Sequence, residues 1–490
     1  MESQPARASQ PAGASQPTGA SLREPGAILL LSCYELGHQP LSLASPAAFL
    51  RRAGFAPALL DLSQAKLDDE AVRRARLIAV SVPMHTALRL GVRAAERIRA
   101  LNPEARLCFY GLYASLNAEA LFRRGIDAVA GGEAEEPLLR LAQSLDRGEA
   151  GPVPGIRTIS HAAGPWLERI PFEVPERGGL PPLDRYVRLE VGRETRVAGQ
   201  VEASHGCLHL CRHCPIPPVY GGRFFVVPRE TVLADIRQQV EAGAAHISFG
   251  DPDFLNGPGH AMAVARALHA AFPAVTFDVT AKIEHLLRHR DHLKELRDLG
   301  CLFVVSAVES LNDGVLAILD KGHTRADVET ALRITDAAGI TLRPTFVPFT
   351  PWTTLDDYRG LLAFIEDWGL VDAIDPVQLS IRLLVPPGSL LAEHPAFLPF
   401  RGALDEERFT YHWVHPDPRL NRLQAEVSGI VERAARSGEA AAESFERIVS
   451  ATNRAAARTA NAVRERRIPR IPPARRDKGR APRLTEPWFC

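Results

Sequence analysis

Three cysteines lie close together in the middle of the chain, in the segment Cys207-Leu-His-Leu-Cys211-Arg-His-Cys214. Gaps of three and two residues let three thiolates converge on one side of a single loop. Cysteine thiolates are the usual protein ligands of iron–sulfur clusters. Three ligands on a four-iron cluster leave one iron open, and an open metal position is where a substrate can bind. The spacing therefore predicts a 4Fe-4S cluster on Cys207, Cys211 and Cys214.

A tetrahedral zinc site is the alternative chemistry for the same loop, with His209 or His213 as the fourth ligand. The chain after the loop does not resemble a small zinc module, which favours the cluster. The chain has seven cysteines, an odd number that does not form a disulfide framework. We expect Cys33, Cys108 and Cys301 to be small buried residues on or near strands.

The elements that must position this loop follow it as a βα series. An apolar strand precedes the first cysteine, and helical and apolar segments alternate after it. Expected strands are Val201–His205, His246–Gly250, Thr276–Thr280, Cys301–Val308, Thr341–Val347 and Val377–Leu383; expected helices are Arg229–Ala242, His260–Ala271, His289–Asp298, Arg325–Ala338 and Thr354–Trp368. Six βα units predict a partial TIM-like barrel, whose active residues lie at the C-terminal ends of the strands.

An earlier region of the chain also alternates between strands and helices. Expected strands are Ala27–Ser32, Ala58–Leu62, Leu77–Val82, Arg106–Tyr110 and Ala128–Ala130. This spacing predicts an α/β fold with a doubly wound parallel sheet. Ligands of such sheets bind at the carboxyl ends of the strands, where Cys33-Tyr34-Glu35, Pro83-Met84-His85 and Gly131-Gly132-Glu133 would gather.

Composition divides the chain into six regions. Residues 1–25 repeat Ser-Gln-Pro and are expected to be disordered. We then expect the doubly wound domain at 26–147, a Gly- and Pro-rich linker at 148–200 and the barrel at 201–385. A mixed and helical region at 386–463 and a basic tail at 464–490 complete the chain.

Charge and hydropathy bear on partners and location. Basic and acidic residues balance at 58 each, so the whole chain offers no global attraction to nucleic acid or anionic membrane. The basic tail is more simply a solvated segment than a nucleic-acid arm, so a nucleic-acid partner is unlikely. No apolar run approaches the roughly 20 residues of a membrane span, and the N-terminus has no signal-peptide pattern. We therefore expect a cytoplasmic protein in a reducing compartment.

The cysteine loop resembles the signature of the radical S-adenosylmethionine (SAM) superfamily, CxxxCxxC after the first strand of a partial barrel. The resemblance implies that SAM binds the open iron and that an electron from the cluster cleaves one of its carbon–sulfur bonds, giving a carbon radical. The family usually has an aromatic residue beside the adenine where this chain has His213, and a histidine can stack there too.

Downstream motifs resemble the subgroup that carries a cobalamin-binding domain. These are Phe249-Gly-Asp251-Pro-Asp253-Phe, Val305-Ser-Ala-Val-Glu309-Ser310 and Leu319-Asp-Lys-Gly-His-Thr324. The resemblance places Glu309 and Ser310 at the ribose or amino end of SAM. Asp251 and Asp253 would either contact the ligand or cap the following turn. Arg343 and Arg382, near barrel strands, would bind a carboxylate of SAM or substrate, or lie on the surface.

The expected N-terminal domain is similar to the cobalamin-binding arrangement, and Gly131-Gly132-Glu133 matches the segment that ends it. The Asp-x-His-x-x-Gly motif that supplies an axial histidine is absent. Relatives in this subgroup also lack it, so cobalamin binding stays open. His38 and His85 are more simply loop histidines than cobalt ligands.

The C-terminus, Leu484-Thr-Glu-Pro-Trp-Phe-Cys490, resembles that of the CUAEP/CCAEP-tail radical SAM proteins, whose tail carries Cys followed by Cys or selenocysteine, then Ala-Glu-Pro. The resemblance implies a redox or substrate-facing role for Cys490 and a native product that continues past it through selenocysteine. An incidental Cys beside an aromatic anchor is the alternative.

The resemblance implies a radical SAM enzyme that acts on a small molecule or peptide. An electron donor such as flavodoxin or ferredoxin would reduce its cluster. Alternatives within this class are transfer of the 3-amino-3-carboxypropyl group, as in an arsenical-antibiotic branch, and cobalamin-dependent methyl transfer or ring rearrangement. An alternative of another class is a non-catalytic metal- or redox-sensing protein.

Overall fold

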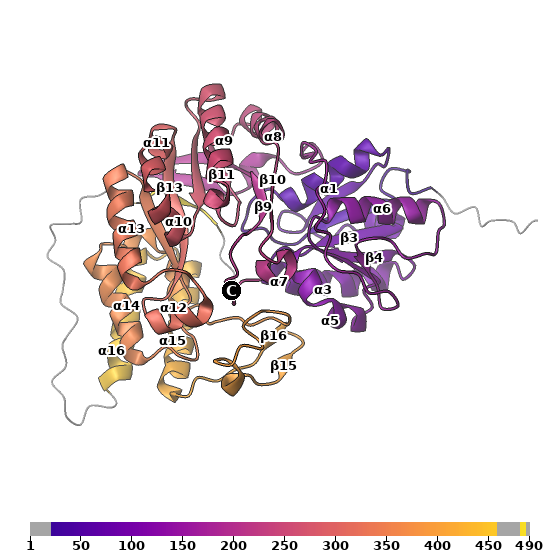
Figure 1. The fold of residues 1–490 in the computed structure, drawn as a ribbon. Coiled ribbons are helices and arrows are strands. Elements are labelled where there is room, and N and C mark those ends of the chain that lie inside the picture. The colour runs from indigo at the N-terminus through magenta and orange to yellow at the C-terminus, as the bar shows by residue number, and fades with distance from the viewer. Residues whose placement is uncertain (1–20, 458–480, 487–490) are drawn as a thin grey trace, which may run out of the picture.

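The computed structural model describes residues 21–457 and 481–486, which form two α/β domains side by side (Figure 1). The indigo and purple N-terminal domain is built on one sheet. The magenta to orange domain is built on a second, larger sheet, whose helices cover its outer face. The last expected region, 464–490, and Cys490 with it, lies outside the described residues except for 481–486.

The N-terminal domain has strand order β2-β1-β3-β4-β5-β6, parallel except for β6. The strands are β1 (Ile28–Ser32), β2 (Ala58–Asp61), β3 (Leu77–Ser81), β4 (Arg106–Tyr110), β5 (Ala128–Ala130) and β6 (Ile156–Arg157). The helices are α1 (Leu41–Arg52), α2 (Asp69–Arg74), α3 (His85–Leu101), α4 (Leu112–Leu116), α5 (Ala118–Arg123) and α6 (Glu135–Asp146). Strand order reverses between β1 and β3, the switch point where doubly wound sheets bind ligands.

Both faces of this sheet are buried, so its strands are continuous apolar runs rather than alternating ones. Ile28 and Leu30 pack on one face, and Leu29 and Leu31 pack on the other. The doubly wound sheet predicted from these runs is confirmed. Packing begins before the expected boundary at residue 26, because Leu22 is buried and its backbone N–H donates to Asp146.

The larger sheet has strand order β14-β13-β12-β11-β8-β7-β17. Its strands are β7 (Arg188–Val191), β8 (Glu194–Val201), β11 (His246–Phe249), β12 (Thr276–Thr280), β13 (Cys301–Glu309), β14 (Thr341–Phe346) and β17 (Arg483–Leu484). The run from β8 to β14 is parallel, whereas β7 and β17 are antiparallel to their neighbours. The predicted partial barrel is confirmed as a curled open sheet.

The helices of this domain are α7 (Ile216–Tyr220), α8 (Arg229–Glu241), α9 (Pro258–Ala271), α10 (Ile283–Arg288), α11 (Leu293–Asp298), α12 (Asp313–Leu319), α13 (Arg325–Ala338), α14 (Leu355–Asp367), α15 (Pro418–Ser437) and α16 (Ala441–Ala457). Short 3-10 helices are η1 (Leu183–Arg185), η2 (Phe254–Asn256), η3 (Arg290–His292), η4 (Val371–Ala373), η5 (Pro376–Leu379) and η6 (Leu398–Phe400). Two hairpins pair β9 (Ser204–Gly206) with β10 (Phe224–Val226) and β15 (Leu404–Asp405) with β16 (Thr410–Tyr411).

Two expected barrel strands differ in the structure. The first strand is β8, which ends at Val201 where the expected segment began, and the cysteines follow the separate hairpin strand β9. The sixth expected strand, Val377–Leu383, is a 3-10 helix, η5, followed by a single parallel bridge between Phe349 and Arg382. The side chain of Gln378 accepts from the backbone N–H of Phe346, where a neighbouring strand would have offered a carbonyl.

The C-terminal segment 481–486 connects the two ends of the open sheet. β17 pairs with β7, while the carbonyl of Pro482 accepts a hydrogen bond from Arg343 on β14, at the opposite end of the sheet. Glu486 then reaches the N-terminal domain, where Oε1 lies 3.0 Å from Nε2 of His38. Because β17 runs in the same direction as the parallel strands, the segment points toward their C-terminal ends.

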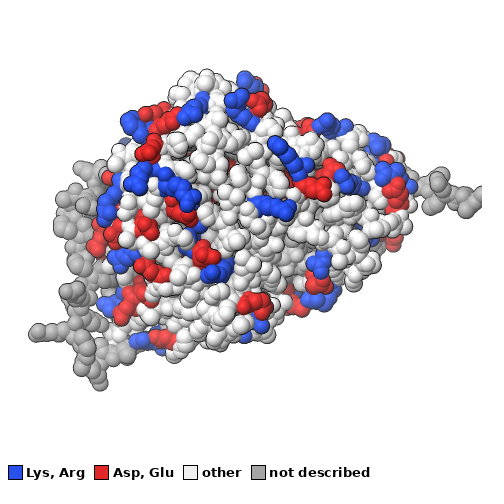
Figure 2. All heavy atoms as spheres, in the orientation of Figure 1, with Lys and Arg blue, Asp and Glu red and all other residues white. Residues whose placement is uncertain are grey.

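The described helices include none with the length and apolar character that crossing a membrane requires. On the face shown in Figure 2, acidic and basic side chains are intermixed and neither sign forms a continuous patch. This mixture agrees with the zero net charge of the sequence.

Candidate active site

The cysteine loop begins where the β9–β10 hairpin opens. Gly206 has φ +77°, and a Cβ there would lie 2.5 Å from the carbonyl oxygen of Arg223, so the turn requires a glycine. The N–H of Cys207 donates to that same carbonyl at 3.1 Å. A second backbone bond, from Cys214 N–H to the Cys211 carbonyl, closes the loop before α7. The hairpin therefore fixes the start of the loop and α7 fixes its end.

The three thiols fit the ligand set that the spacing predicts. All three are free, Cys207 and Cys211 are buried, and Cys214 is half-buried. Burial raises the pKa of Cys214 to about 12, and the charges of Cys211 and Cys207 act in the same direction. Iron coordination would replace these protons, since a metal binds the thiolate and releases the proton. Cys207, Cys211 and Cys214 could together hold one cluster.

Glu309 lies opposite this loop, at the C-terminal end of β13. Its Oε1 is 3.2 Å from Nε2 of His213 and 3.3 Å from Nζ of Lys321. Burial alone would raise the pKa of Glu309, but Lys321 and the hydrogen bond from His213 outweigh burial and lower it to about 2. Glu309 is therefore a carboxylate at neutral pH, held between a cationic side chain and a residue of the cysteine loop.

The backbone at Glu309 is strained. Its φ is +68°, and the register of β13 against β14 shifts between Ala307 and Glu309. A non-glycine residue in this region is uncommon, and a bulge at a strand end re-aims the side chain. The irregularity turns Glu309 toward His213 and Lys321. Backbone strain of this kind concentrates at functional sites.

The two aspartates after β11 have different surroundings. Asp251 accepts from the N–H of Ala203 at 2.9 Å and the hydroxyl of Ser204 at 2.6 Å, so both its oxygens bind the start of the β9 segment. Burial raises the pKa of Asp251 to about 7. Asp253 caps η2 through Oδ1, and its Oδ2 faces His285 and His209. The structure therefore ties Asp251 to the backbone and leaves one oxygen of Asp253 facing side chains.

Two other predicted site residues, Ser310 and Arg343, already bind groups of the protein itself. The hydroxyl of Ser310 accepts from the N–H of Asn312, although Ser310 adjoins Glu309. Arg343 is buried and binds Asp375 at 2.9 Å and the carbonyl of Pro482 at 3.1 Å. Its role in this structure is to anchor the C-terminal segment.

The N-terminal domain lies directly against the cysteine loop. Glu133 has a fully buried side chain and accepts from the hydroxyl of Tyr220 at 3.0 Å, and its Oε2 lies 2.8 Å from Nδ1 of His205. Burial, and after it the nearby Cys214, raise the pKa of Tyr113 on α4. In Figure 1, α7 lies between the two domains. The carboxyl edge of the first sheet therefore covers the loop that carries the cysteines.

The same edge carries His38 and His85, the two histidines considered as cobalt ligands. Nε2 of His38 lies 3.0 Å from Glu486, while its buried Nδ1 has no hydrogen-bond partner. Nε2 of His85 lies 2.6 Å from the carbonyl of Arg408. At the switch point, the carboxylate of Glu35 accepts hydrogen bonds from the hydroxyls of Ser32 and Ser42, so this part of the edge is polar. The described edge therefore fits a polar ligand, but these contacts do not identify a histidine that would bind cobalt.

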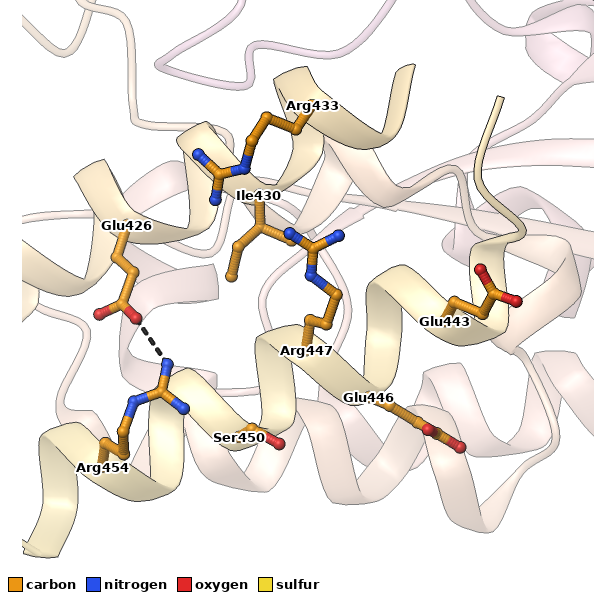
Figure 3. Close-up of a pocket in the computed structure, with 8 residues that line it drawn as sticks. All are labelled: Glu426, Ile430, Arg433, Glu443, Glu446, Arg447, Ser450 and Arg454. Atoms are coloured by element: carbon orange, nitrogen blue, oxygen red, sulfur yellow. Dashed lines mark hydrogen bonds and ion pairs between the residues drawn. The ribbon is translucent and has the colours of Figure 1, made fainter. Parts of the chain in front are cut away.

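A surface depression lies elsewhere, between α15 and α16 (Figure 3). Figure 3 shows Arg433 on one helix and Arg447 and Arg454 on the other, with Glu426 and Arg454 joined at 2.7 Å. Its lining contains ion-paired or solvated surface groups, and none of the residues around the cysteine loop. We assign it no part in the chemistry.

Comparisons with known families decide the identity of both domains. Residues 201–365 match the family model described as the radical SAM superfamily, and residues 28–142 match the B12 binding domain. The chain carries a B12-binding domain followed in sequence by a radical SAM domain. The predicted superfamily is thereby confirmed, while the predicted likeness of the tail to CUAEP/CCAEP proteins stays a prediction.

Solved structures show the same fold. The radical SAM methyltransferase TsrM from Kitasatospora setae, with tryptophan and a SAM analogue, has 20% identity and a TM-score of 0.57, over 70% of this chain and 71% of that one. OxsB, a cobalamin-dependent SAM radical enzyme, with aqua-cobalamin and SAM bound, has 16% identity and a TM-score of 0.64, over 81% of this chain and 66% of that one. A search of curated protein sequences gives no match.

The radical SAM domain contains site residues that spacing alone did not single out. Lys321 stands in a motif that the sequence did show, Leu319-Asp-Lys-Gly-His-Thr324, but only the fold reveals that its ammonium lies against Glu309 and near Cys211 and Cys214. Tyr220 and His285 had no local signal, because their partners are distant in sequence.

Proposed function

We propose that this radical SAM enzyme cleaves SAM reductively at a 4Fe-4S cluster held by Cys207, Cys211 and Cys214. The resulting carbon radical would modify an unactivated position of a small molecule or peptide. The observation that carries the proposal is the group of three free thiols on one covered loop opposite the Glu309–Lys321 pair. The radical SAM match over 201–365 supports it.

When bound, the cluster supplies one electron to SAM and an open iron for its amino and carboxylate groups. The protein's own groups prepare this event. The three thiolates hold the metal, and Glu309 offers an ionised carboxylate whose position is fixed by His213 and Lys321. A carboxylate in that place can accept from the hydroxyl or amino groups of SAM, and we infer that Ser310 beside it contributes a hydroxyl.

The N-terminal domain helps to exclude water from the cysteine loop. Glu133 binds Tyr220 and His205 on the two sides of the cysteine loop, and Tyr113 lies near Cys214. A covered site protects a reactive carbon radical from side reactions with solvent. We infer that a small electron-transfer protein such as flavodoxin or ferredoxin reduces the enzyme. A cytoplasmic location would fit this requirement.

The test is an anaerobic assay of the reconstituted enzyme with dithionite and SAM. We expect 5′-deoxyadenosine from the wild-type enzyme and no product above background from Cys211→Ala. A matched control, Cys33→Ala, removes a buried thiol that lies in the other domain and should retain cleavage. Equal product formation by Cys211→Ala and wild type would overturn the proposal.

A second candidate is cobalamin-dependent methyl transfer, which the B12-binding domain match favours. Equilibrium dialysis with hydroxocobalamin would detect binding, and S-adenosylhomocysteine would accompany the methyl transfer. Methylthioadenosine would instead indicate transfer of the 3-amino-3-carboxypropyl group. Absence of any SAM cleavage would favour a binding protein over an enzyme.

A further inference from the structure

Beside the cysteine loop, three side chains from three separate segments converge. His209 lies between Cys207 and Cys211, Asp253 follows β11, and His285 is on α10, just after β12. One ring nitrogen of each histidine and one carboxylate oxygen of Asp253 all lie within 4.8 Å of one another. We propose that His209, Asp253 and His285 bind one divalent transition-metal ion, Zn²⁺ or Fe²⁺, separate from the cluster.

The donor set has the composition such ions prefer. Imidazole nitrogen and carboxylate oxygen are common ligands of zinc, and two histidines with one carboxylate also form the ferrous site of many non-heme iron proteins. The spacing is close to that of bound ligands, since Oδ2 of Asp253 lies 2.7 Å from Nδ1 of His285 and 3.7 Å from Nε2 of His209. Small rotations of the side chains would bring all three donors onto one ion.

A second observation concerns the polar atoms themselves. The side chain of Asp253 is fully buried and that of His285 is 5% exposed. Nδ1 of His285 lies 2.7 Å from Oδ2 of Asp253, yet the two atoms are not aligned as a hydrogen bond, and both lack a hydrogen-bond partner. Buried polar atoms without partners are costly. Two potential ligand atoms that lie this close together without a hydrogen bond between them fit binding to a common ion.

The surroundings fit the outer sphere of such a site. Oε2 of Glu284 lies 3.8 Å from Nδ1 of His209, the ring nitrogen opposite the proposed ligand atom. Metal-binding histidines commonly direct their second nitrogen toward a carboxylate. Lys282 is the nearby cation, and Glu284 lies 3.7 Å from it and offsets its charge.

The location suggests what the ion would do. His209 belongs to the loop of the cluster cysteines, so an ion held also by Asp253 and His285 would fix that loop to the ends of β11 and β12. Three protein ligands leave at least one coordination position open. His209 is 16% exposed, so this position could take an oxygen or nitrogen donor of a substrate from the solvent side.

The experiment uses the full chain with its cluster reconstituted, then equilibrated with micromolar Zn²⁺ and separated from free metal. We expect one zinc per chain in addition to four irons. Asp253→Asn and His285→Gln should each weaken zinc binding at least about tenfold while the iron content stays at four. His289→Gln, whose ring neighbours His285 without joining the group, is the matched control and should keep its zinc.

X-ray absorption at the zinc edge separates this site from zinc bound by the cysteines. We expect nitrogen and oxygen neighbours at about 2.0–2.1 Å, whereas a sulfur shell at about 2.3 Å would overturn the proposal. Zinc equal to that of the wild type in both variants, or no zinc beyond the cluster, would also overturn it. A parallel titration with Fe²⁺ should give a fifth iron, high-spin and ferrous by Mössbauer spectroscopy, if iron is the preferred ion. If a variant does not fold, His209→Gln, at a partly exposed position, replaces it. None of these readouts depends on SAM cleavage.

Discussion

The ammonium of Lys321 lies 3.3 Å from Oε1 of Glu309, and both side chains are at least nine-tenths buried. Burial on its own would lower the pKa of Lys321, but Glu309 and the nearby Cys211 and Cys214 outweigh burial and raise it. Lys321 is therefore charged at neutral pH. A buried positive charge is thus fixed beside two of the three cysteines proposed to hold the cluster.

Replacing Lys321 with Met should lower the reduction potential of the cluster. A positive charge stabilises the more negative, reduced state, and its removal should shift the midpoint by tens of millivolts in a redox titration followed by electron paramagnetic resonance (EPR). Lys294→Met, which removes an exposed lysine paired with Asp298, is the control and should leave the potential unchanged. An unchanged potential in Lys321→Met would place the ammonium outside the influence of the cluster.

Tyr220→Phe should loosen the contact between the two domains. The variant deletes the hydroxyl that donates to the fully buried Glu133, and a buried acceptor that loses its donor costs about 1–3 kcal/mol. Urea unfolding measures the loss, and Tyr411→Phe, which removes a hydroxyl outside this contact, is the comparison. Equal stability of Tyr220→Phe and the wild type would show that water or His205 replaces the bond.

Glu35 should make stability depend on pH. Burial, with Asp61 and Glu202 nearby, raises its pKa from 4.5 to about 7 despite the hydrogen bond from Ser42. A raised carboxyl pKa contributes stability that is complete below about pH 4.5 and is lost as the pH rises through about 7. In Glu35→Gln this loss should be absent.

The stability of Glu35→Gln relative to the wild type should therefore increase between pH 5 and pH 8. The pKa shift of Glu35 corresponds to at most about 3 kcal/mol of folding stability, and to less because Glu35 keeps part of its surface exposed. Thermal unfolding across this range measures it, with the exposed Glu149→Gln as control. Parallel pH profiles for wild type and Glu35→Gln would contradict the prediction.

The sequence predicted the features that depend on local spacing. The first five strands of the N-terminal sheet agree within a residue or two because each is a short, mainly apolar run between turns, such as Ile28–Ser32, whereas β6 (Ile156–Arg157) was not predicted. The cysteine loop followed from the gaps between Cys207, Cys211 and Cys214, and Glu309 followed from a motif at a strand end.

What the sequence could not predict depends on contacts between distant segments. Nothing near Asp251 and Asp253 distinguishes them, yet Asp251 binds the backbone of Ala203 and Asp253 faces His285. The sequence left open whether Arg343 binds a carboxylate of SAM or substrate or lies on the surface, and in the structure it is buried and binds Asp375 and the carbonyl of Pro482. The apolar run 377–383 satisfied a strand pattern, but Pro376 and the side chain of Gln378 give it a 3-10 turn instead.

The C-terminus can be tested by two truncations that separate structure from chemistry. Ending the chain after Glu486 keeps β17 and the His38 contact, so we expect an unchanged melting temperature. Turnover should fall if Cys490 is redox-active or faces the substrate. Ending the chain after Ala457 removes β17, which pairs with β7, and the Pro482 carbonyl that accepts from Arg343, and should lower the melting temperature as well. Full turnover by the chain that ends after Glu486 would refute a role for Cys490.

The most direct test of the central claim is the EPR spectrum of the reduced, reconstituted enzyme before and after SAM is added. The account predicts the signal of one reduced 4Fe-4S cluster per chain, a change of that signal on SAM binding to the open iron, and loss of the signal in Cys207→Ala, Cys211→Ala and Cys214→Ala. A full cluster signal that SAM leaves unaltered, or one that survives in Cys211→Ala, would contradict it.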